Sequence, residues 1–139
     1  MKVSFTVAGE PKGKGRPRFS KVGDRMIART PADTVVYENY IKVEYQRQCD
    51  SKRFEDNAML DLRINAFYAI PESASKKRKK AMEDREDRPT KKPDADNILK
   101  VVADSLNQLA YRDDAQVVDT QIRKFWSHTP RLEISIQNI

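Results

Sequence analysis

Residues 93–110 read PDADNILKVVADSLNQLA, and their apolar pattern predicts the helix around which the fold is built. Apolar side chains recur at steps of three and four, which is the period of one helix face. The residues of this stripe are Leu99, Val102, Ala103, Leu106, Leu109 and Ala110. We therefore expect a helix from Asp96 to Ala110 whose apolar face covers a core.

Alternating apolar residues predict the strands that this helix covers. The clearest strand runs from Ala58 to Ile70, where large apolar side chains alternate with Asp61, Arg63 and Asn65. Three further strands are expected, at Val3 to Val7, Val117 to Phe125 and Arg131 to Ile136. The first of them ends where a glycine and a proline follow it.

A second helix is expected from Pro31 to about Gln48, because Thr30 and Pro31 resemble an N-cap and a first-turn proline. Its apolar positions are scattered rather than regular: Val35, Val36, Ile41, Val43 and Tyr45. A chain of 139 residues fits one domain of ordinary size. We therefore expect a single α/β (α+β) domain over residues 1–139, with a mixed β-sheet covered by two main helices.

The composition indicates a charged and basic surface. Charged residues make up 35% of the chain, the formal net charge is +6, and the isoelectric point is near 9.5. Such a charge favours a polyanionic partner, although solubility alone also explains it. Cys49 is the only cysteine, which excludes an intramolecular disulfide and a cysteine-based zinc site. With no apolar signal segment and no stretch long enough to span a bilayer, we expect a cytoplasmic protein without a membrane partner.

A basic loop follows the first strand. Lys12, Lys14, Arg16 and Arg18 alternate with glycine and proline, so the segment is not a regular helix and its backbone can approach a phosphate closely. It is not a Walker loop, because three residues rather than four separate Gly9 from Gly13, and Gly15 stands where serine or threonine is required. Contact with phosphate and an ordinary solvated turn both remain open.

A second basic segment begins after a turn and helix start at Pro71 to Ser75. It consists of Lys76, Lys77, Arg78, Lys79 and Lys80, and the acidic residues Glu83, Asp84, Glu86 and Asp87 follow it. The run is either a solvated helix face with local charge pairing, a DNA-backbone contact or a mobile arm. Residues 88–93 then form a stiff, non-helical connector that carries Lys91 and Lys92.

Acidic residues cluster at two points of this basic chain. If the backbone after Pro93 is extended, Asp94 and Asp96 point to the same side, and two hard oxygen ligands suit magnesium or manganese. Aspartate is also a favoured N-cap, so a helix that begins here needs no metal. Asp113 and Asp114 lie between the predicted helix and the next strand, where the chain can return the second pair to the first. Asp113 and Asp114 also fit an ordinary turn.

The remaining candidates have structural explanations that the sequence favours. His128, the only histidine, lies in a segment typical of a hairpin turn, although a lone histidine can serve as a general base. Tyr111, Phe125 and Trp126 are aromatic residues that can stack on unpaired bases, but such residues more often belong to a core or an interface.

These motifs together resemble the RusA family of Holliday junction resolvases, found in bacteria and their prophages. The resemblance rests on Lys12-Gly13-Lys14-Gly15-Arg16-Pro17-Arg18, Asp94-Ala95-Asp96-Asn97-Ile98-Leu99-Lys100 and Asp113-Asp114-Ala115-Gln116-Val117. It implies metal-binding catalytic carboxylates at Asp94, Asp96 and Asp114, an essential lysine at Lys100, and supporting roles for Asn97 and Asp113. One departure is Pro93, where some members have a basic residue whose charge Lys91 and Lys92 can replace.

By this resemblance the chain is a homodimeric, Mg²⁺-dependent endodeoxyribonuclease, with Mn²⁺ as a possible substitute, that resolves four-way DNA junctions during recombination and repair. It would then be associated with the nucleoid and encoded by a bacterium or a phage. The side chains expected to contact DNA are Lys12, Lys14, Arg16, Arg18, Lys76, Lys77, Arg78, Lys79, Lys80, Lys91 and Lys92. Two alternatives stay open: a basic DNA- or RNA-binding protein without catalysis, and a structure-selective nuclease of different specificity.

Overall fold

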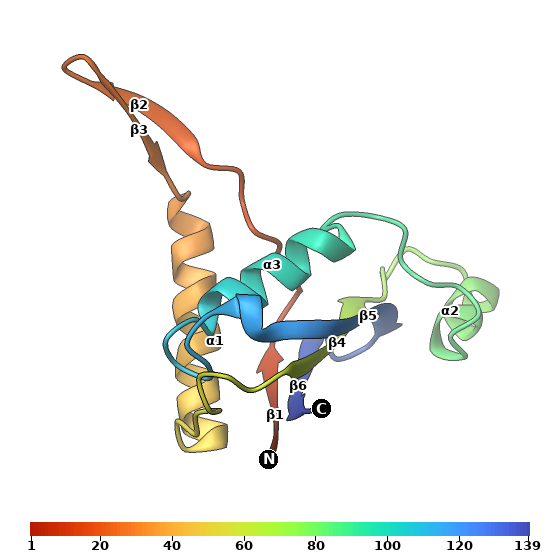
Figure 1. The fold of residues 1–139 in the computed structure, drawn as a ribbon. Helices are drawn as coiled ribbons and strands as arrows, with labels where there is room; N and C mark the ends of the chain where they lie inside the picture. The colour runs from red at the N-terminus through yellow and green to blue at the C-terminus, as the bar shows by residue number, and fades with distance from the viewer.

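The computed structural model describes all residues from Met1 to Ile139 and is built on a mixed four-stranded sheet (Figure 1). The strand order is β1 (Lys2–Ala8), β6 (Arg131–Asn138), β4 (Leu60–Ala69) and β5 (Val117–Ser127). β6 is antiparallel to both of its neighbours, and β5 is parallel to β4. The predicted strands are confirmed within two residues at each end, as is the α+β class with a mixed sheet.

One face of the sheet carries the core. Along β4 the inward side chains are buried, as the alternation predicted; they are Leu60, Leu62, Ile64, Ala66 and Tyr68. A single hydrophobic cluster joins them to Trp126 of β5, to Met82, and to buried residues of β1, β6 and the two helices that cover this face. These helices are α1 (Ala32–Cys49) and α3 (Ala95–Ser105), which lie together on this face (Figure 1). No helix combines the length and the apolar character that a bilayer crossing requires.

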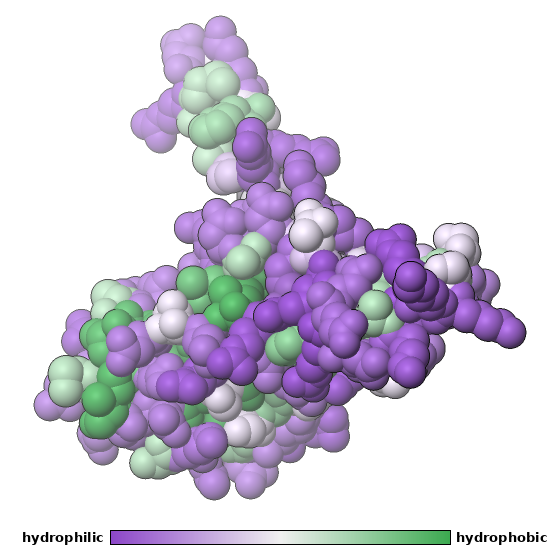
Figure 2. Space-filling view, turned by 90° about the vertical axis from the view of Figure 1, so that its right-hand side faces the viewer, coloured by the Kyte–Doolittle hydropathy of each residue, from purple (hydrophilic) through white to green (hydrophobic).

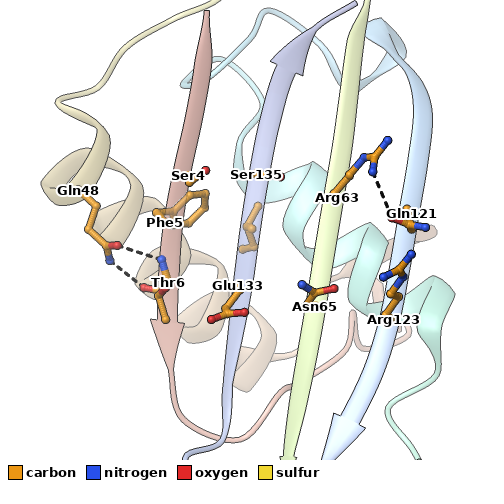
Figure 3. A pocket seen from close by; sticks show the side chains of 11 residues that line it. Ser4, Phe5, Thr6, Gln48, Arg63, Asn65, Gln121, Arg123, Glu133 and Ser135 are labelled. Carbon is orange, nitrogen blue, oxygen red and sulfur yellow. Dashed lines mark hydrogen bonds between the residues drawn. The ribbon is translucent and has the colours of Figure 1, made fainter. Parts of the chain in front are cut away.

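The opposite face of the sheet is polar and open. It carries a shallow hollow of about 490 Å³. Figure 3 shows the side chains that line it, which come from all four strands and from Gln48. The side chains of Arg63 and Gln121 meet there at 3.4 Å, and Gln48 of α1 forms two hydrogen bonds with the backbone of Thr6 at the edge strand. None of the predicted catalytic residues lines this hollow.

α1 forms where it was expected, but a different set of residues anchors it. Pro31 occupies the N-cap position itself, so the helix begins one residue later than predicted. The buried residues that follow a four-residue step are Tyr37, Ile41, Tyr45 and Cys49. Val35, Val36 and Val43 are exposed, which corrects the expectation that they contribute to the apolar face. A strict step of four keeps side chains on one face of a helix, and the valines lie outside that face.

α3 ends at Ser105, five residues earlier than predicted. The chain turns back instead, with Gln108 in the left-handed region at φ 64°, and Ala110 donates to the carbonyl of Leu106. Leu106 and Ala110 remain buried, so the apolar period continues after the helix has ended. This turn returns the chain toward the middle of α3 before β5 begins.

One helix and one hairpin extend beyond α1 and α3, although Met82 of this helix is fully buried in the core cluster. α2 (Lys76–Glu83) begins at Ser75, whose hydroxyl accepts a hydrogen bond from the Arg78 backbone, as the predicted helix start requires. The hairpin of β2 (Arg18–Val22) and β3 (Arg25–Arg29) was not predicted and projects away from the sheet (Figure 1). Gly23 occupies its tip at φ 63°, a conformation that favours glycine.

Candidate active site

The first acidic pair lies at the start of α3. Asp94 is the N-cap residue with an extended backbone, yet its side chain makes no capping hydrogen bond. Asp96 lies in the first turn, and the positive end of the helix favours both negative charges there. The Asp94 carboxylate therefore remains available to a ligand. A residue that served only as an N-cap would instead be expected to make the capping hydrogen bond.

A pocket between α3 and β5 brings the two acidic clusters together. Its volume is about 260 Å³, and its lining includes Asp96, Lys100 and Asp114. Asp96 and Lys100 are four residues apart and share a helix face, while Asp114 comes from the 3₁₀ helix η1 (Asp114–Gln116) that precedes β5. Leu62, Leu99, Ala103 and Val117 form the apolar part of the lining. The predicted approach of Asp114 to the start of α3 thus takes the form of a shared pocket.

Asp113 and Asp114, the second acidic pair, differ in what their side chains contact. The Asp113 side chain accepts a hydrogen bond from Ala115 N at 2.9 Å and forms a capping box with Gln116. The backbone N–H of Asp114 donates to the Asn107 side chain at 2.8 Å, in the turn that follows α3. Asp113 therefore holds the turn, whereas the Asp114 carboxylate faces the pocket without an ion-pair partner.

The donor set fits a hard divalent cation. Asp94, Asp96 and Asp114 form no ion pair with any lysine or arginine, although the chain is strongly basic. Carboxylate oxygens are the ligands that Mg²⁺ and Mn²⁺ prefer. Asp94 lies outside the pocket lining, and no three acidic, histidine or cysteine side chains are grouped closely enough to enclose a metal by themselves. Two carboxylates thus share the pocket, and the third stands beside it at the helix start.

The basic loop is packed against the start of α3. Lys14 N donates to the Asn97 carbonyl at 2.9 Å, and a Cβ atom on Gly13 would lie only 2.8 Å from the Cβ of Asn97. Gly15 N donates to Thr34 Oγ1 at 3.1 Å, which ties the same loop to α1. The glycines thus permit the close approach that holds this loop beside the two aspartates.

The chain matches the family model described as endodeoxyribonuclease RusA over residues 8–137. It belongs to the RusA family. It is 37% identical over 139 residues to the uncharacterized protein YqaN of Bacillus subtilis (strain 168), covering 99% of this chain and 96% of that protein. It is also 31% identical over 103 residues to the crossover junction endodeoxyribonuclease rusA of Lactococcus phage r1t, covering 73% and 72%. The family is therefore one of endodeoxyribonucleases, as the sequence resemblance implied.

The sequence analysis did not single out one basic residue near Asp94. Lys124 on β5 donates from Nζ to the carbonyl of Lys91 at 2.7 Å and lies 5.0 Å from the Tyr68 ring centre. Burial lowers the pKa of Lys124, and the nearby charge of Asp94 partly opposes this effect. Its position in the predicted strand could have indicated it. Lys124 lies two residues after Ile122 and four after Thr120, so all three side chains point to the same face of β5.

Two buried tyrosines, Tyr68 and Tyr111, bind the backbone near the acidic residues. Tyr68 donates to the Pro93 carbonyl at 2.5 Å, next to Asp94, and Tyr111 donates to the Ala103 carbonyl at 2.6 Å. Burial chiefly raises the pKa of Tyr111, with Asp114 as the next contribution. Both tyrosines are fully buried, so the interpretation of Tyr111 as a core residue is confirmed.

The predicted DNA-contacting residues differ in their surroundings. Lys14 is largely buried between Glu38 at 3.2 Å and Asp104 at 3.5 Å, so it links the loop to α1 and α3. Arg78 pairs with Asp87 at 3.3 Å. The others form no ion pair; they are Lys12, Arg16, Arg18, Lys76, Lys77, Lys79, Lys80, Lys91 and Lys92.

His128 lies in the turn between β5 and β6, but this turn is not the hairpin that was predicted, because β4 lies between the two strands and pairs with both. Its Nε2 is 2.8 Å from Glu83 Oε1, so the ring pairs with the end of α2. Phe125 and Trp126 are buried, and Trp126 Nε1 donates to Asp87. None of these three residues lines the pocket of Asp96 and Asp114.

Proposed function

We propose that this chain is a metal-dependent endodeoxyribonuclease that resolves four-way DNA junctions by cutting two opposed strands. The observation that carries the proposal is the pocket that joins Asp96 and Lys100 of α3 to Asp114. Membership of the RusA family supplies the chemical class, and the phage relative is named for action at crossover junctions. The pocket explains why a basic chain keeps unpaired carboxylates at this place.

Asp94, Asp96 and Asp114 are the residues that would hold Mg²⁺, with Mn²⁺ as a substitute. A divalent cation bound by such ligands activates water and relieves charge on a phosphodiester. Lys100 lies in the same pocket as two of these carboxylates. Its ammonium group would stabilise the extra negative charge of the transition state, a contribution of about 3–4 kcal/mol for a well-placed group.

Basic residues surround the approach to this pocket. The loop with Lys12 and Arg16 packs on the start of α3, and the connector with Lys91 and Lys92 leads directly into Asp94. α2 lies near the same end of α3 (Figure 1). Lysine and arginine bind DNA mainly through its phosphates, so these side chains would hold the strands on either side of the scissile bond. Asn97 and Asp113 would act in support, by anchoring the loop and the turn.

We propose further that the enzyme works as a homodimer. A four-way junction has approximate two-fold symmetry and requires two cuts, which a symmetric pair of sites provides. Every residue of the β2–β3 hairpin is exposed, including Phe19 at 68% and Met26 at 65%. An isolated two-stranded hairpin is only marginally stable in water, so a partner would stabilise it. Sedimentation that shows a monomer at working concentrations would contradict the dimer.

The decisive experiment compares cleavage and binding of a synthetic four-way junction with Mg²⁺. We expect Asp96→Asn and Asp114→Asn to bind the junction as wild type does and to lose cleavage by about 100-fold or more. Asp113→Asn is the matched control, because asparagine also caps helices and removes one charge at the neighbouring position. It should keep most of the cleavage.

Three outcomes separate the alternatives. A wild-type protein that binds the junction and never cuts it with Mg²⁺ or Mn²⁺ is a binding module, and the catalytic proposal fails. Cleavage of duplex, flap or single-stranded DNA in preference to the junction indicates a nuclease of different specificity. If Asp113→Asn loses as much cleavage as Asp114→Asn, the assignment of Asp114 rather than Asp113 as a metal ligand is wrong.

A further inference from the structure

Two aromatic residues are buried on the sheet face that is opposite to the core. Phe67 of β4 and Phe125 of β5 are neighbours in register, with ring centres 5.4 Å apart. They are only 4% and 6% exposed, yet neither belongs to the hydrophobic cluster beneath α1 and α3. Something other than the core covers them.

Three arginines provide this cover. The guanidinium carbons of Arg85 and Arg88 lie 4.4 Å and 4.5 Å from the centre of the Phe125 ring. That of Arg131 lies 3.9 Å from the centre of the Phe67 ring. Since arginine stacks through its flat face, its N–H groups lie at the edge of the plane and can bind a second ligand. Those of Arg131 are partly used already, because Arg131 donates to Glu133, to the Ser127 hydroxyl and to the Thr129 carbonyl.

Three nearby carboxylates are paired, one of them with Arg131 itself, whereas Asp84 and Glu86 beside Arg85 in the chain form no ion pair. Glu83 is 2.8 Å from His128, Asp87 is 3.3 Å from Arg78, and Glu133 is 3.3 Å from Arg131. Neither Arg85 nor Arg88 has an acidic partner within 4 Å. Two unpaired guanidinium groups therefore stand over one ring, where their mutual repulsion favours a bound anion.

The backbone at Arg85 gives a second and independent reason to assign a role to its side chain. Arg85 follows the end of α2 with φ 64°, in the left-handed region where glycine is normally found. An arginine at this position is under backbone strain that glycine would avoid. The residue therefore contributes through its side chain, which reaches Phe125.

Arg85 and Arg131 border a hollow that is open to solvent, and Glu83 also lines it. Its volume is about 220 Å³, and Arg85, Arg131 and His128 contribute to its lining. Figure 2 looks onto the side of the molecule that carries α2, and this side is predominantly hydrophilic.

The cluster is linked to the active site through β5. Arg88 Nε donates to the Lys124 carbonyl at 2.9 Å, which leaves the terminal nitrogens of Arg88 free. The Lys124 side chain in turn donates to the Lys91 carbonyl, just before Asp94. A DNA strand that leaves the start of α3 along the connector would pass this cluster.

We propose that Arg85 and Arg88, supported by Arg131, form a phosphate-binding site for the backbone of a duplex arm of the DNA substrate. The site deepens the proposed function and rests on it, because it assumes that the pocket at α3 acts on DNA. It differs from the lysines of α2 in that its guanidinium groups are fixed by stacking before DNA binds. Preorganised groups lose less conformational entropy on binding.

The test removes charge while it retains the cover over the rings. In Arg85→Met/Arg88→Met the long, apolar side chains still shield Phe125. Binding of a fluorescent four-way junction is measured by anisotropy in a chelator, which prevents cutting, over a range of salt concentrations. Each lost phosphate contact lowers the slope of log K against log salt by about 0.9, so we expect a loss of about 1.8 and at least roughly tenfold weaker binding near 0.1 M salt.

Two controls accompany this variant. Lys52→Met removes an exposed charge beyond the end of α1, away from α2, and should leave binding within about twofold of wild type. Arg85→Lys/Arg88→Lys keeps both charges and should keep most of the salt dependence. If the double methionine variant does not fold, Arg85→Met and Arg88→Met are measured separately, each with an expected slope loss of about 0.9.

The possible failures are distinguishable. If the folded methionine variants bind the junction with the slope and affinity of wild type, the arginines only cover the phenylalanines, and this proposal is wrong. If wild type neither binds nor cuts the junction, the proposed function itself is wrong. Weakened binding in the lysine variant equal to that in the methionine variant would also overturn the phosphate site, since charge would then be immaterial.

Discussion

Gly13 lies where the basic loop touches the start of α3, and its replacement by alanine tests whether this contact holds the active site. The added Cβ would lie 2.8 Å from the Asn97 Cβ and 3.1 Å from the Pro93 Cβ. Ordinary contacts begin near 3.4 Å, so the loop must move by at least about 0.6 Å. This shift would stretch the hydrogen bond from Lys14 N to the Asn97 carbonyl, now 2.9 Å. Overpacking of this kind costs about 1–3 kcal/mol.

We expect Gly13→Ala to lower the free energy of unfolding by that amount with an unchanged urea dependence. The single tryptophan, Trp126, is buried and reports the transition by fluorescence. Junction cleavage by the folded fraction should fall by about tenfold or more, because displacement of Asn97 also moves Asp96, and small misplacements of catalytic groups are costly.

Gly23→Ala is the matched control at the hairpin tip. A Cβ there meets no atom within 4 Å, but φ is 63°, so only the backbone penalty of about 1–2 kcal/mol applies. Its cleavage pocket should be unaffected. The reasoning is refuted if the free energy of unfolding of Gly13→Ala lies within about 0.5 kcal/mol of the wild-type value and the variant cuts the junction at the wild-type rate.

Two further predictions concern stability. Lys14→Met should destabilise the protein by about 1.5–3 kcal/mol in urea unfolding, because it leaves Glu38 and Asp104 without their shared partner, whereas Lys12→Met should change stability by less than about 0.5 kcal/mol. Tyr37→Phe should stabilise by about 1 kcal/mol, because the buried Tyr37 hydroxyl makes no hydrogen bond. Burial raises the pKa of Tyr37 from 10.0 to about 12, so ionisation of Tyr37 in the unfolded chain lowers the stability of the protein further as pH rises from about 10 toward 12. Unfolding at a series of pH values should show a shallower loss over this range in Tyr37→Phe, and an identical loss in both proteins would contradict the assignment.

Local patterns were sufficient where a side chain's role depends on its neighbours in the chain. The alternation along Ala58 to Ile70 predicted β4 because a step of two places every apolar residue on one face. The start of α3 was likewise visible in Pro93, Asp94 and the apolar stripe that follows. The end of α3 was not, because Leu106 and Ala110 stay buried in a turn and keep the helical period after the hydrogen bonds of the helix have stopped.

The roles of individual charges could not be assigned from the pattern. Lys12 and Lys14 occupy equivalent places in the basic loop, yet only Lys14 is held between Glu38 and Asp104, from two different helices. Asp113 and Asp114 are adjacent, yet one caps a turn and the other faces the pocket. These differences depend on contacts with residues that are distant in the chain, and the sequence around each residue does not indicate such contacts.

The sequence by itself determined the family and the class of the fold, and it supplied the candidates for binding a cation or a phosphate, because these depend on residue type, spacing and period. Only the tertiary structure decided that Asp114 shares a pocket with Asp96 and Lys100, and that three arginines meet over Phe67 and Phe125. Such contacts join segments far apart in the chain, and their geometry is fixed by the register of β4, β5 and β6 and by the turn after α3.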